Sequence, residues 1–219
     1  RVEGNNFDIR KQLLQYDDVM NNQREIIYAR RNEILDSESI HENTLNLFYE
    51  HISELVNSHL IETNKLSDDD YNEILEAVNE NLLKNANLKL SEILNKEINE
   101  IIEVIEVKVL NEYENKIKEL PEEIRNDFEK AISLRVIDNY WMEHINTMDH
   151  LREGVSLRGY ANEDPLQAYI REGFELFDNM LDKISKDTTL YLLKAEIRQN
   201  LEVKQVKGSA NSGAEKVSK

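Results

Sequence analysis

The stretch Leu151-Arg-Glu-Gly-Val-Ser-Leu-Arg-Gly-Tyr-Ala-Asn-Glu-Asp-Pro165 separates two segments in which apolar residues recur every three or four positions. Such a period is typical of amphipathic helices. The recurring residues are Ile137, Trp141, Ile145 and Met148 before the stretch, and Leu166, Ile170, Phe174, Phe177, Leu181 and Ile184 after it. Two facing apolar stripes predict a helical hairpin with residues 151–165 at its tip. Because packed interiors deform little, we expect Trp141, Met148, Phe174 and Phe177 to stiffen this hairpin.

Glycine and proline mark where one helix of the hairpin is expected to end and the next to begin. Gly154 and Gly159 are expected to release the chain from helical geometry and to act as the hinges of the loop. Asp164 followed by Pro165 has the form of an N-cap and a first helical residue. The second helix is therefore predicted to begin at this pair.

The predicted loop carries more apolar and aromatic side chains than a turn requires, namely Val155, Leu157 and Tyr160, with Arg152 and Arg158 beside them. Loops held out by rigid elements often carry function. The ring face and hydroxyl of Tyr160 suit contacts with many unrelated groups, and the arginines suit acidic groups and carbonyls. The alternative is that Tyr160 packs back on the hairpin and fills the turn.

A long helix is predicted near the N-terminus, where apolar residues from Ile9 to Ile34 lie on one stripe. At about 1.5 Å per residue this helix would be about 40 Å long, too long for a single compact core. Gln23 and Arg30 interrupt the stripe. The interruptions favour a strut along which other domains pack over a self-sufficient coiled coil.

Further helices are predicted between this strut and the hairpin. Ser39 and Glu42 have the spacing of a capping box, and Ser67 followed by three aspartates is a second helix start. Residues 101–109 alternate enough to suggest a strand, but the spacing of the flanking Glu and Lys residues favours a helix. Pro121 then restarts a helix that runs into the hairpin.

Two segments resemble one family, and they occur in that family's order. The segment Trp141-Met-Glu-His-Ile-Asn-Thr-Met-Asp-His-Leu-Arg-Glu-Gly-Val-Ser-Leu-Arg-Gly-Tyr-Ala-Asn-Glu-Asp-Pro165 is similar to the two-helix finger of the SecA family, the ATP-driven motors of bacterial protein export. The segment Asn6-Phe-Asp-Ile-Arg-Lys-Gln-Leu-Leu-Gln-Tyr-Asp-Asp-Val19 is similar to the start of that family's long scaffold helix. The resemblance runs over roughly residues 1–200 and is strongest at these two places.

The resemblance implies an all-α fold with a protruding helical hairpin. Its parts would be a long scaffold helix at residues 1–36, a helical wing domain at 37–117, a scaffold helix with the two-helix finger at 118–204, and a flexible tail at 205–219. The last range has linker composition.

The resemblance also implies a function, as the C-terminal scaffold and wing part of an export motor. This part would couple ATP hydrolysis in motor domains that precede Arg1 to the movement of a preprotein through the SecY channel. ATP and Mg would bind those motor domains, and no cofactor is expected in this chain. Implied partners are the SecY channel, preproteins, the protein's own motor domains and a second copy of the parent protein in a homodimer. The implied location is the cytoplasm, peripherally at the inner face of the cell membrane.

Specific contact residues follow from the matched motifs. Val155, Leu157, Arg158 and Tyr160 are expected to contact the polypeptide or the channel at the finger tip. The match at Tyr16, Asp17 and Asp18 implies an interdomain contact. Adjacent side chains on a helix point about 100° apart, so the two aspartates do not converge on one atom. An ion pair or hydrogen bond to a neighbouring domain is therefore favoured over catalysis.

Composition excludes several classes of function. The 219 residues include no cysteine, so a disulfide or thiolate zinc site is excluded, and the five histidines lack the spacing of a metal-binding helix face. The net charge is −17, and residues 37–117 carry 18 acidic against 6 basic side chains. This excess of negative charge argues against nucleic acid, and against an anionic membrane surface, as a partner of residues 37–117. No apolar run approaches the roughly 20 residues that cross a bilayer, so a soluble protein is expected. No Gly-x-x-x-x-Gly-Lys-Ser/Thr motif occurs, so we do not expect this chain alone to be an enzyme.

Three alternatives remain open. The chain could be a structural helical adaptor without a transport role, or the same region of an accessory SecA paralogue. The third alternative is an enzyme with a hydrolytic or metal cluster drawn from Asp17, Asp18, Glu143, His144 and Asp149. It is disfavoured because no nucleophile, oxyanion site or metal-ligand set converges in the pattern.

Overall fold

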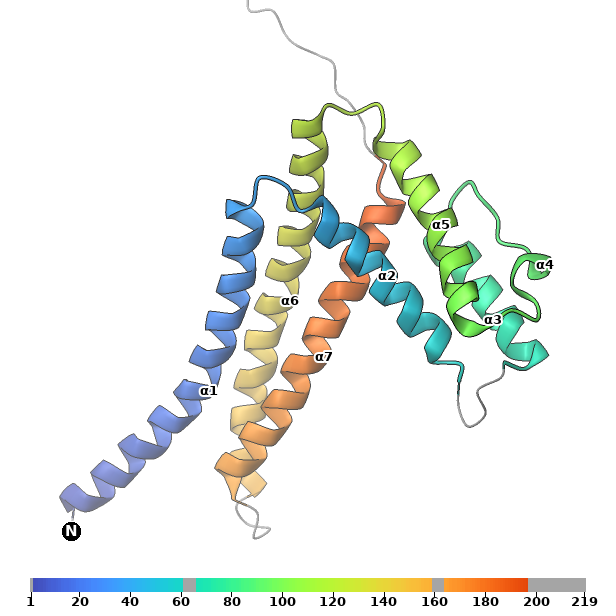
Figure 1. The fold of residues 1–219 in the computed structure, drawn as a ribbon. Helices are drawn as coiled ribbons and strands as arrows, with labels where there is room; N and C mark the ends of the chain where they lie inside the picture. The colour runs from blue at the N-terminus through green and yellow to red at the C-terminus, as the bar shows by residue number, and fades with distance from the viewer. Residues whose placement is uncertain (1, 61–65, 159–163, 197–219) are drawn as a thin grey trace, which may run out of the picture.

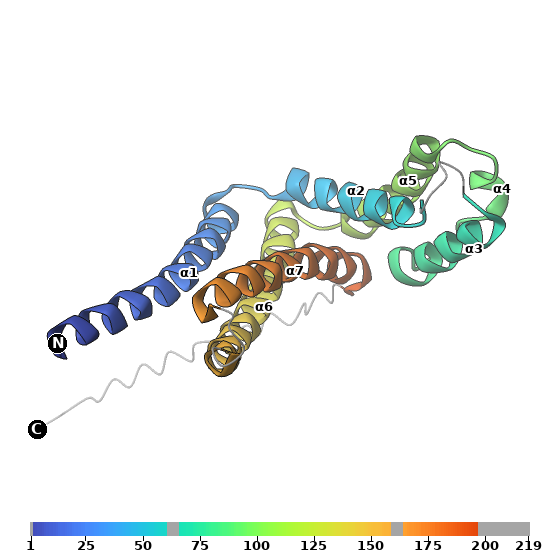
Figure 2. The same ribbon diagram turned by 90° about the horizontal axis from the view of Figure 1, so that it is seen from below.

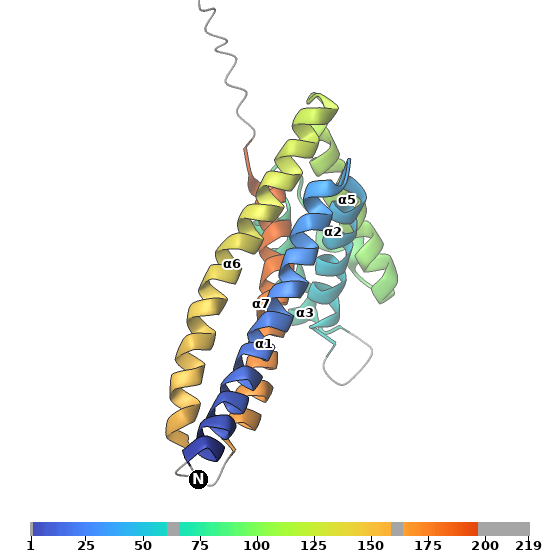
Figure 3. The same cartoon turned by 90° about the vertical axis from the view of Figure 1, so that its left-hand side faces the viewer.

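The computed structural model describes residues 2–60, 66–158 and 164–196, and every regular element within these ranges is helical. The prediction of an all-α fold is thus confirmed. Three long helices lie side by side, as the views in Figure 1 and Figure 3 agree: α1 (Val2–Asp36), α6 (Glu122–Arg158) and α7 (Pro165–Lys194). We call them the three-helix bundle.

A second group of helices lies to one side of the bundle. It consists of α2 (His41–Asn57), α3 (Asp68–Ala77), a π-helical turn η1 (Val78–Leu82), α4 (Leu90–Ile93) and α5 (Ile98–Ile117). Figure 2, seen from below, shows α2 leading away from the end of α1 toward α3, α4 and α5. We call this group the side unit.

The bundle core contains the apolar residues that all three helices turn inward. Ile27 of α1, Ile137 and Trp141 of α6, and Phe177 and Ile184 of α7 are buried together. Trp141 is only 6% exposed, so its predicted place between the helices is confirmed. These rings and branched chains fill the space between the helices, which is what resists deformation in a packed interior.

The buried face of α7 differs from the prediction. Phe174 is 68% exposed, so the expectation that it stiffens the hairpin is wrong, and Ile170 is 40% exposed. Phe177 and Ile184 of the predicted stripe are buried, together with Tyr169, Gly173 and Met180, which the stripe did not include. Because α7 packs against α1 as well as α6, its buried face is turned toward both neighbours.

Helix α6 does not end at Gly154, where the sequence predicted its end. It continues through Gly154 to Arg158, and none of the described glycines has a positive φ. The expectation that Gly154 is a hinge is therefore wrong. A glycine inside a helix costs only about 1 kcal/mol, which packing of the neighbouring turn can offset. The predicted start of α7 is confirmed, because the Asp164 side chain accepts a hydrogen bond from the Leu166 N–H and Pro165 is the first helical residue.

The apolar core of the side unit is built around α5 and also contains Leu192 and Leu193 from the end of α7. Ile101, Ile105, Val109, Tyr113 and Ile117 recur at helical spacing and are buried. They confirm a helix rather than a strand over residues 101–109. Helix α2 packs against α5 and against α7, so it joins the side unit to the bundle.

The helix start predicted at Ser67 is confirmed, and it forms a capping box that was not predicted. Ser67 accepts from the Asp70 N–H, and the Asp70 carboxylate accepts from the Ser67 N–H. The box predicted at Ser39 and Glu42 is wrong, because α2 begins one residue later, with Ile40 at the N-cap. The Ser39 hydroxyl instead accepts from the His41 N–H and donates to Asn126 of α6.

Two lysines satisfy the last carbonyls of neighbouring helices. Lys130 of α6 donates to the Leu35 and Ser37 carbonyls at the end of α1, whose last turn has no basic residue. Lys116 of α5 donates to the carbonyls of Leu192 and Leu193 at the end of α7, with a distance of 2.9 Å for Leu193. Terminal carbonyls lack partners within their own helix, and a cation there also complements the helix dipole. Each lysine therefore fastens the end of one helix to another helix.

Candidate functional site: the loop end of the hairpin and its contact with α1

Tyr16 connects α1 to both helices of the hairpin near the end where α6 and α7 meet. Its ring lies 4.8 Å from the Tyr169 ring of α7, at an interplanar angle of 59°. The Arg152 guanidinium of α6 lies over the Tyr16 ring at 5.3 Å from the centroid. Aromatic pairs and cation–π contacts of this geometry add to the free energy of apolar burial. Tyr16 therefore touches α6 and α7 at once.

The neighbouring carboxylate reinforces this contact. Asp17 accepts a charge-assisted hydrogen bond from Arg152 at 3.2 Å, with the Asp17 side chain 56% exposed. Exposed pairs of this kind stabilise by only about 0–1 kcal/mol, so the pair orients the helices more than it holds them. Asp18 is exposed on the same helix. Asp17 therefore forms an ion pair with another helix of the same bundle, whereas the contact with a neighbouring domain stays a prediction.

A close contact between Gly173 and a side chain of α6 lies one turn deeper in the bundle. A Cβ built on Gly173 of α7 would meet Met148 Cε of α6 at 2.6 Å and Val19 Cγ1 of α1 at 3.9 Å. Real Cβ atoms do not approach a neighbour as closely as 2.6 Å, so only glycine fits here without a shift of Met148. Gly173 lets the three helices come together behind the Tyr16 contact.

A buried hydrogen-bond chain ties the same helices together. The Gln23 side-chain amide donates to the Gly173 carbonyl at 3.0 Å, and the Gln23 amide oxygen faces His144 Nε2 at 2.9 Å. Because the amide oxygen can only accept, His144 Nε2 must carry a hydrogen. The ring stacks on Trp141 at 5.7 Å and lies 5.6 Å from the Phe177 ring. Gln23 therefore binds α6 and α7 through polar atoms at a point where the rest of the core is apolar.

Burial sets the charge state of these groups. Desolvation lowers the pKa of His144 below its usual value of 6.5, because the apolar surroundings disfavour the imidazolium. Desolvation likewise raises the pKa of Tyr169, and burial with the nearby Asp164 raises the pKa of Tyr16. The two tyrosines and the histidine are therefore neutral at neutral pH. The charge at this site belongs to Arg152 and the two aspartates.

The predicted tip residues fall in different places. Val155 is fully buried against the Met148 and Tyr169 side chains, so the expectation that it offers an exposed contact is wrong. Its burial follows from the extra turn of α6, which carries the residue back onto the bundle. The backbones of Leu157 and Arg158 belong to this turn, but their side chains, like Gly159 and Tyr160, lie outside the described residues.

The arrangement does not support the enzyme alternative. His144 points into the core toward Gln23, Asp17 pairs with Arg152, and Glu143 and Asp149 are exposed on α6. Within residues 2–60, 66–158 and 164–196, no cluster of three or more histidine and acidic residues is arranged to hold a metal ion. The cluster proposed from sequence therefore does not form a catalytic or metal site.

Gln23 is the residue of this site that sequence reasoning missed. In the sequence Gln23 only interrupts the apolar stripe of the first helix. In the structure its side chain is 6% exposed, and both its amide nitrogen and its amide oxygen form hydrogen bonds. A polar residue on an apolar stripe of a long helix is the signal that pointed to it, since a buried polar group needs partners.

Comparison with known families agrees with this architecture. None of the described helices combines the length and apolarity that a membrane span requires. Residues 1–196 match a family model described as the SecA Wing and Scaffold domain. That match includes all three helices of the bundle and the whole side unit, and the chain therefore belongs to the SecA wing and scaffold family.

Proposed function

We propose that this chain passes nucleotide-driven motion from the motor domains of a SecA protein to a polypeptide at the SecY channel. Membership of the family implies a part in the SecA protein-export machinery. The coupling to ATP hydrolysis and the channel contact are the proposal. The chain would act mechanically, with no chemistry of its own.

The contact of Tyr16 and Asp17 with Arg152 and Tyr169 is the observation that carries this proposal. It fastens α1 to the loop end of the hairpin. A displacement applied to α1 would therefore move that end of the hairpin as well. The apolar core around Trp141 and the Gln23 hydrogen bonds oppose sliding of the helices along one another.

The loop between α6 and α7 would contact the other proteins of the export machinery. We assign Tyr160, with Leu157 and Arg158, to contact with the preprotein or the cytosolic face of the SecY channel. The motor domains would bind ATP and Mg and pack against α1. The complete protein would lie in the cytoplasm, peripherally at the inner face of the membrane, and a homodimer is compatible with this arrangement.

The test is a translocation assay with the complete protein, in which protease protection of a preprotein inside membrane vesicles is measured beside ATP turnover. Tyr160→Ala should lower protection while ATP turnover without preprotein and the melting temperature stay near those of the parent. The matched control is Tyr191→Ala, an exposed tyrosine at the opposite end of α7. It should leave protection unchanged.

Each outcome separates the proposal from its alternatives. If Tyr160→Ala lowers the melting temperature, the tyrosine fills the turn and does not act as a contact. If both substitutions leave protection unchanged, the hairpin is a structural adaptor and the proposal fails.

A further inference from the structure

A groove runs along one face of α5, where the side unit meets the end of α7. It has a volume of about 1000 Å³. Lys108, Glu112 and Asn115 lie three or four positions apart in α5, so one face of this helix forms the floor of the groove. Most of the other lining residues lie within residues 82–86 and residues 193–196. We call this feature the α5 groove.

The segments beside the groove are fastened to its floor. The Glu112 carboxylate accepts hydrogen bonds at 2.7–3.0 Å from three successive backbone N–H groups, those of Lys84, Asn85 and Ala86. The end of α7 is held by the same helix, because Lys116 donates to the Leu193 carbonyl at 2.9 Å. Both edges of the groove therefore keep a defined position relative to α5.

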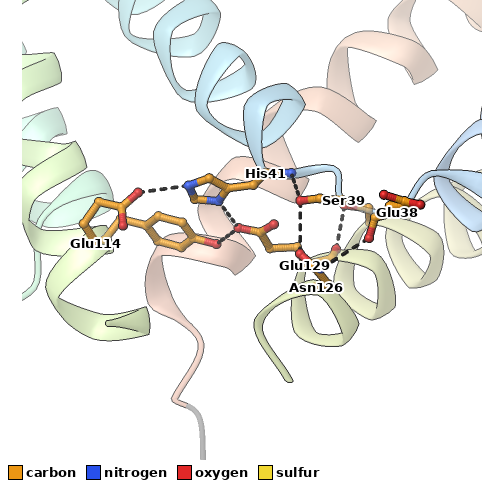
Figure 4. Close-up of polar contacts among 8 residues, drawn as sticks. Glu38, Ser39, His41, Glu114, Asn126 and Glu129 are labelled. Carbon is orange, nitrogen blue, oxygen red and sulfur yellow. Dashed lines mark hydrogen bonds and ion pairs between the residues drawn. The ribbon is translucent and has the colours of Figure 1, made fainter. Parts of the chain in front are cut away.

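The floor is itself held to the other helices by the polar contacts in Figure 4. The His41 ring of α2 lies between two carboxylates, 3.0 Å from Glu114 Oε1 of α5 and 2.7 Å from Glu129 Oε1 of α6. The Tyr113 hydroxyl, from a residue that also lines the groove, donates to Glu129 at 2.9 Å. A segment that binds in the groove therefore does not have to order its walls first, which favours binding.

The end of α7 leads the chain directly into this groove. Helix α7 ends at Lys194, Ala195 has an extended backbone, and both Ala195 and Glu196 line the groove. The Glu196 carboxylate pairs with Lys84 Nζ at 2.7 Å. A trans peptide bond separates neighbouring Cα atoms by about 3.8 Å. Residue 197, which lies outside the described residues, must therefore begin at the groove.

The five residues that follow Glu196 match the groove in length and in the order of their side chains. The lining from Lys108 to Glu119 spans about 16 Å at the helical rise, which about five extended residues would cover. These five residues are Ile197-Arg-Gln-Asn-Leu201. Side chains alternate along an extended chain, so its two apolar ends would face one side and Arg198 the other. The apolar side chains of Leu82, Leu120 and Leu193 line the groove.

Charge favours the same segment. Residues 197–219 carry five basic against two acidic side chains, whereas residues 37–117 carry 18 acidic against 6 basic. A basic segment is therefore attracted to the side unit. Among the residues that the structure describes, the exposed Glu119 carboxylate has no ion-pair partner, although it lines the groove. It can therefore accept a basic side chain without giving up another contact.

We propose that residues 197–201 of this chain bind in the α5 groove as an extended segment. In this arrangement Ile197 and Leu201 cover Leu120 and Leu193, and Arg198 pairs with Glu119. The bound segment fastens the end of α7 to the side unit and closes the groove to other polypeptides. The family match covers residues 1–196, so the segment lies beyond the matched domain. The proposal does not depend on the role of the chain in export.

The test measures distances in the 219-residue chain, whose lack of cysteine permits selective labelling. Nitroxide spin labels are placed at Asn200→Cys, on the side of the segment that faces away from the floor, and at Glu103→Cys, an exposed position of α5 outside the groove. Pulsed electron paramagnetic resonance gives the distribution of distances between them. We expect a narrow distribution that persists when the labelled chain is diluted with unlabelled chain.

Charge reversal and loss of the apolar contact should each release the segment. Glu119→Arg and Arg198→Glu should broaden the distribution when made singly, and the two together should make it narrow again. Leu201→Asp should broaden it whatever the charge at residue 119, because a carboxylate replaces the side chain that covers the apolar lining. The matched control is Glu123→Arg, the same change of charge at an exposed position of α6 outside the groove, which should leave the distribution narrow. Circular dichroism checks that each variant is folded.

Three results would overturn the proposal. The first is a broad distribution in the parent chain. The second is a narrow distribution that disappears on dilution with unlabelled chain, because the groove would then hold the segment of a second copy. The third is a distribution that stays narrow in both Glu119→Arg and Leu201→Asp, because the segment would then be held elsewhere.

Discussion

Gly173 of α7 lies directly against Met148 of α6, so close that a Cβ on the glycine would come within 2.6 Å of the methionine Cε. Met148 is fully buried, and its neighbours are Tyr169, Ala168 and Val155. The end of its side chain therefore has little free space to move into. Gly173 and Met148 are therefore in close contact behind the Tyr16 and Arg152 contact.

Overpacking at this contact should destabilise the fold. Gly173→Val should lower the free energy of unfolding by about 1–3 kcal/mol, the usual cost of forcing extra carbon atoms into a packed core. Urea denaturation followed by circular dichroism measures this change. Adding Met148→Ala should recover part of the loss, because the shortened side chain vacates the position that the valine needs. Equal stability of Gly173→Val and the parent would show that the helices are not in close contact there.

Gly154 should respond in the opposite way. It lies inside α6, and a Cβ built on it meets nothing within 4 Å. Gly154→Ala should raise the free energy of unfolding by about 0.5–1 kcal/mol, because alanine loses less conformational entropy in a helix. The same urea experiment tests this. If Gly154→Ala is less stable than the parent, residue 154 needs the conformational freedom of glycine, as the hinge prediction implied.

Substitution by alanine should cost much more stability at Trp141 than at Phe174, although both residues belong to the apolar stripes predicted for the hairpin. Trp141→Ala should cost about 3–5 kcal/mol, because it leaves a cavity between the helices of the bundle. Phe174→Ala, at a position that is mostly exposed, should change stability by about 0.5 kcal/mol or less. Thermal and urea melts of the two variants provide the comparison. Similar losses in both variants would contradict the observed orientation of α7.

Stability should fall in mild acid because of His144. Burial lowers the pKa of His144 below 6.5 in the folded chain, so below pH 6.5 the unfolded chain binds a proton that the folded chain does not. The free energy of unfolding then decreases as pH falls, by at most about 1.4 kcal/mol per pH unit for one proton. His144→Gln removes this group and keeps a donor for Gln23, so its stability should decline less between pH 6.5 and 5. Parallel stability curves for variant and parent would show that His144 does not contribute.

Local sequence signals predicted the ends and types of most elements. The long run without proline predicted α1. The Asp164 and Pro165 pair predicted the start of α7, and Ser67 with the aspartates after it predicted the start of α3. Each of these signals acts within one helical turn, through caps and backbone dihedral angles. Such effects can be inferred without knowledge of the tertiary contacts.

The sequence-based predictions were wrong where the conformation or burial of a residue depends on contacts with residues far away along the chain. Gly154 is helical because the turn that contains it packs on the bundle through Val155. Phe174 is exposed because α7 faces two helices, and a stripe of apolar residues does not say which of its edges is buried. The bonds of Gln23 join it to residues 150 and 121 positions away along the chain, so no local pattern could have supplied them.

The proposed function requires α1 and the hairpin to move as one body, and a covalent link across their contact tests this coupling. Asp17→Cys and Arg152→Cys would replace the ion pair in a complete SecA protein stripped of other cysteines, and a short bismaleimide would join them. If the two elements move together, the linked protein should protect a preprotein from protease in vesicles as fast as the same protein before linking. If linking stops translocation while ATP turnover continues, the hairpin must move relative to α1, and the claim is contradicted.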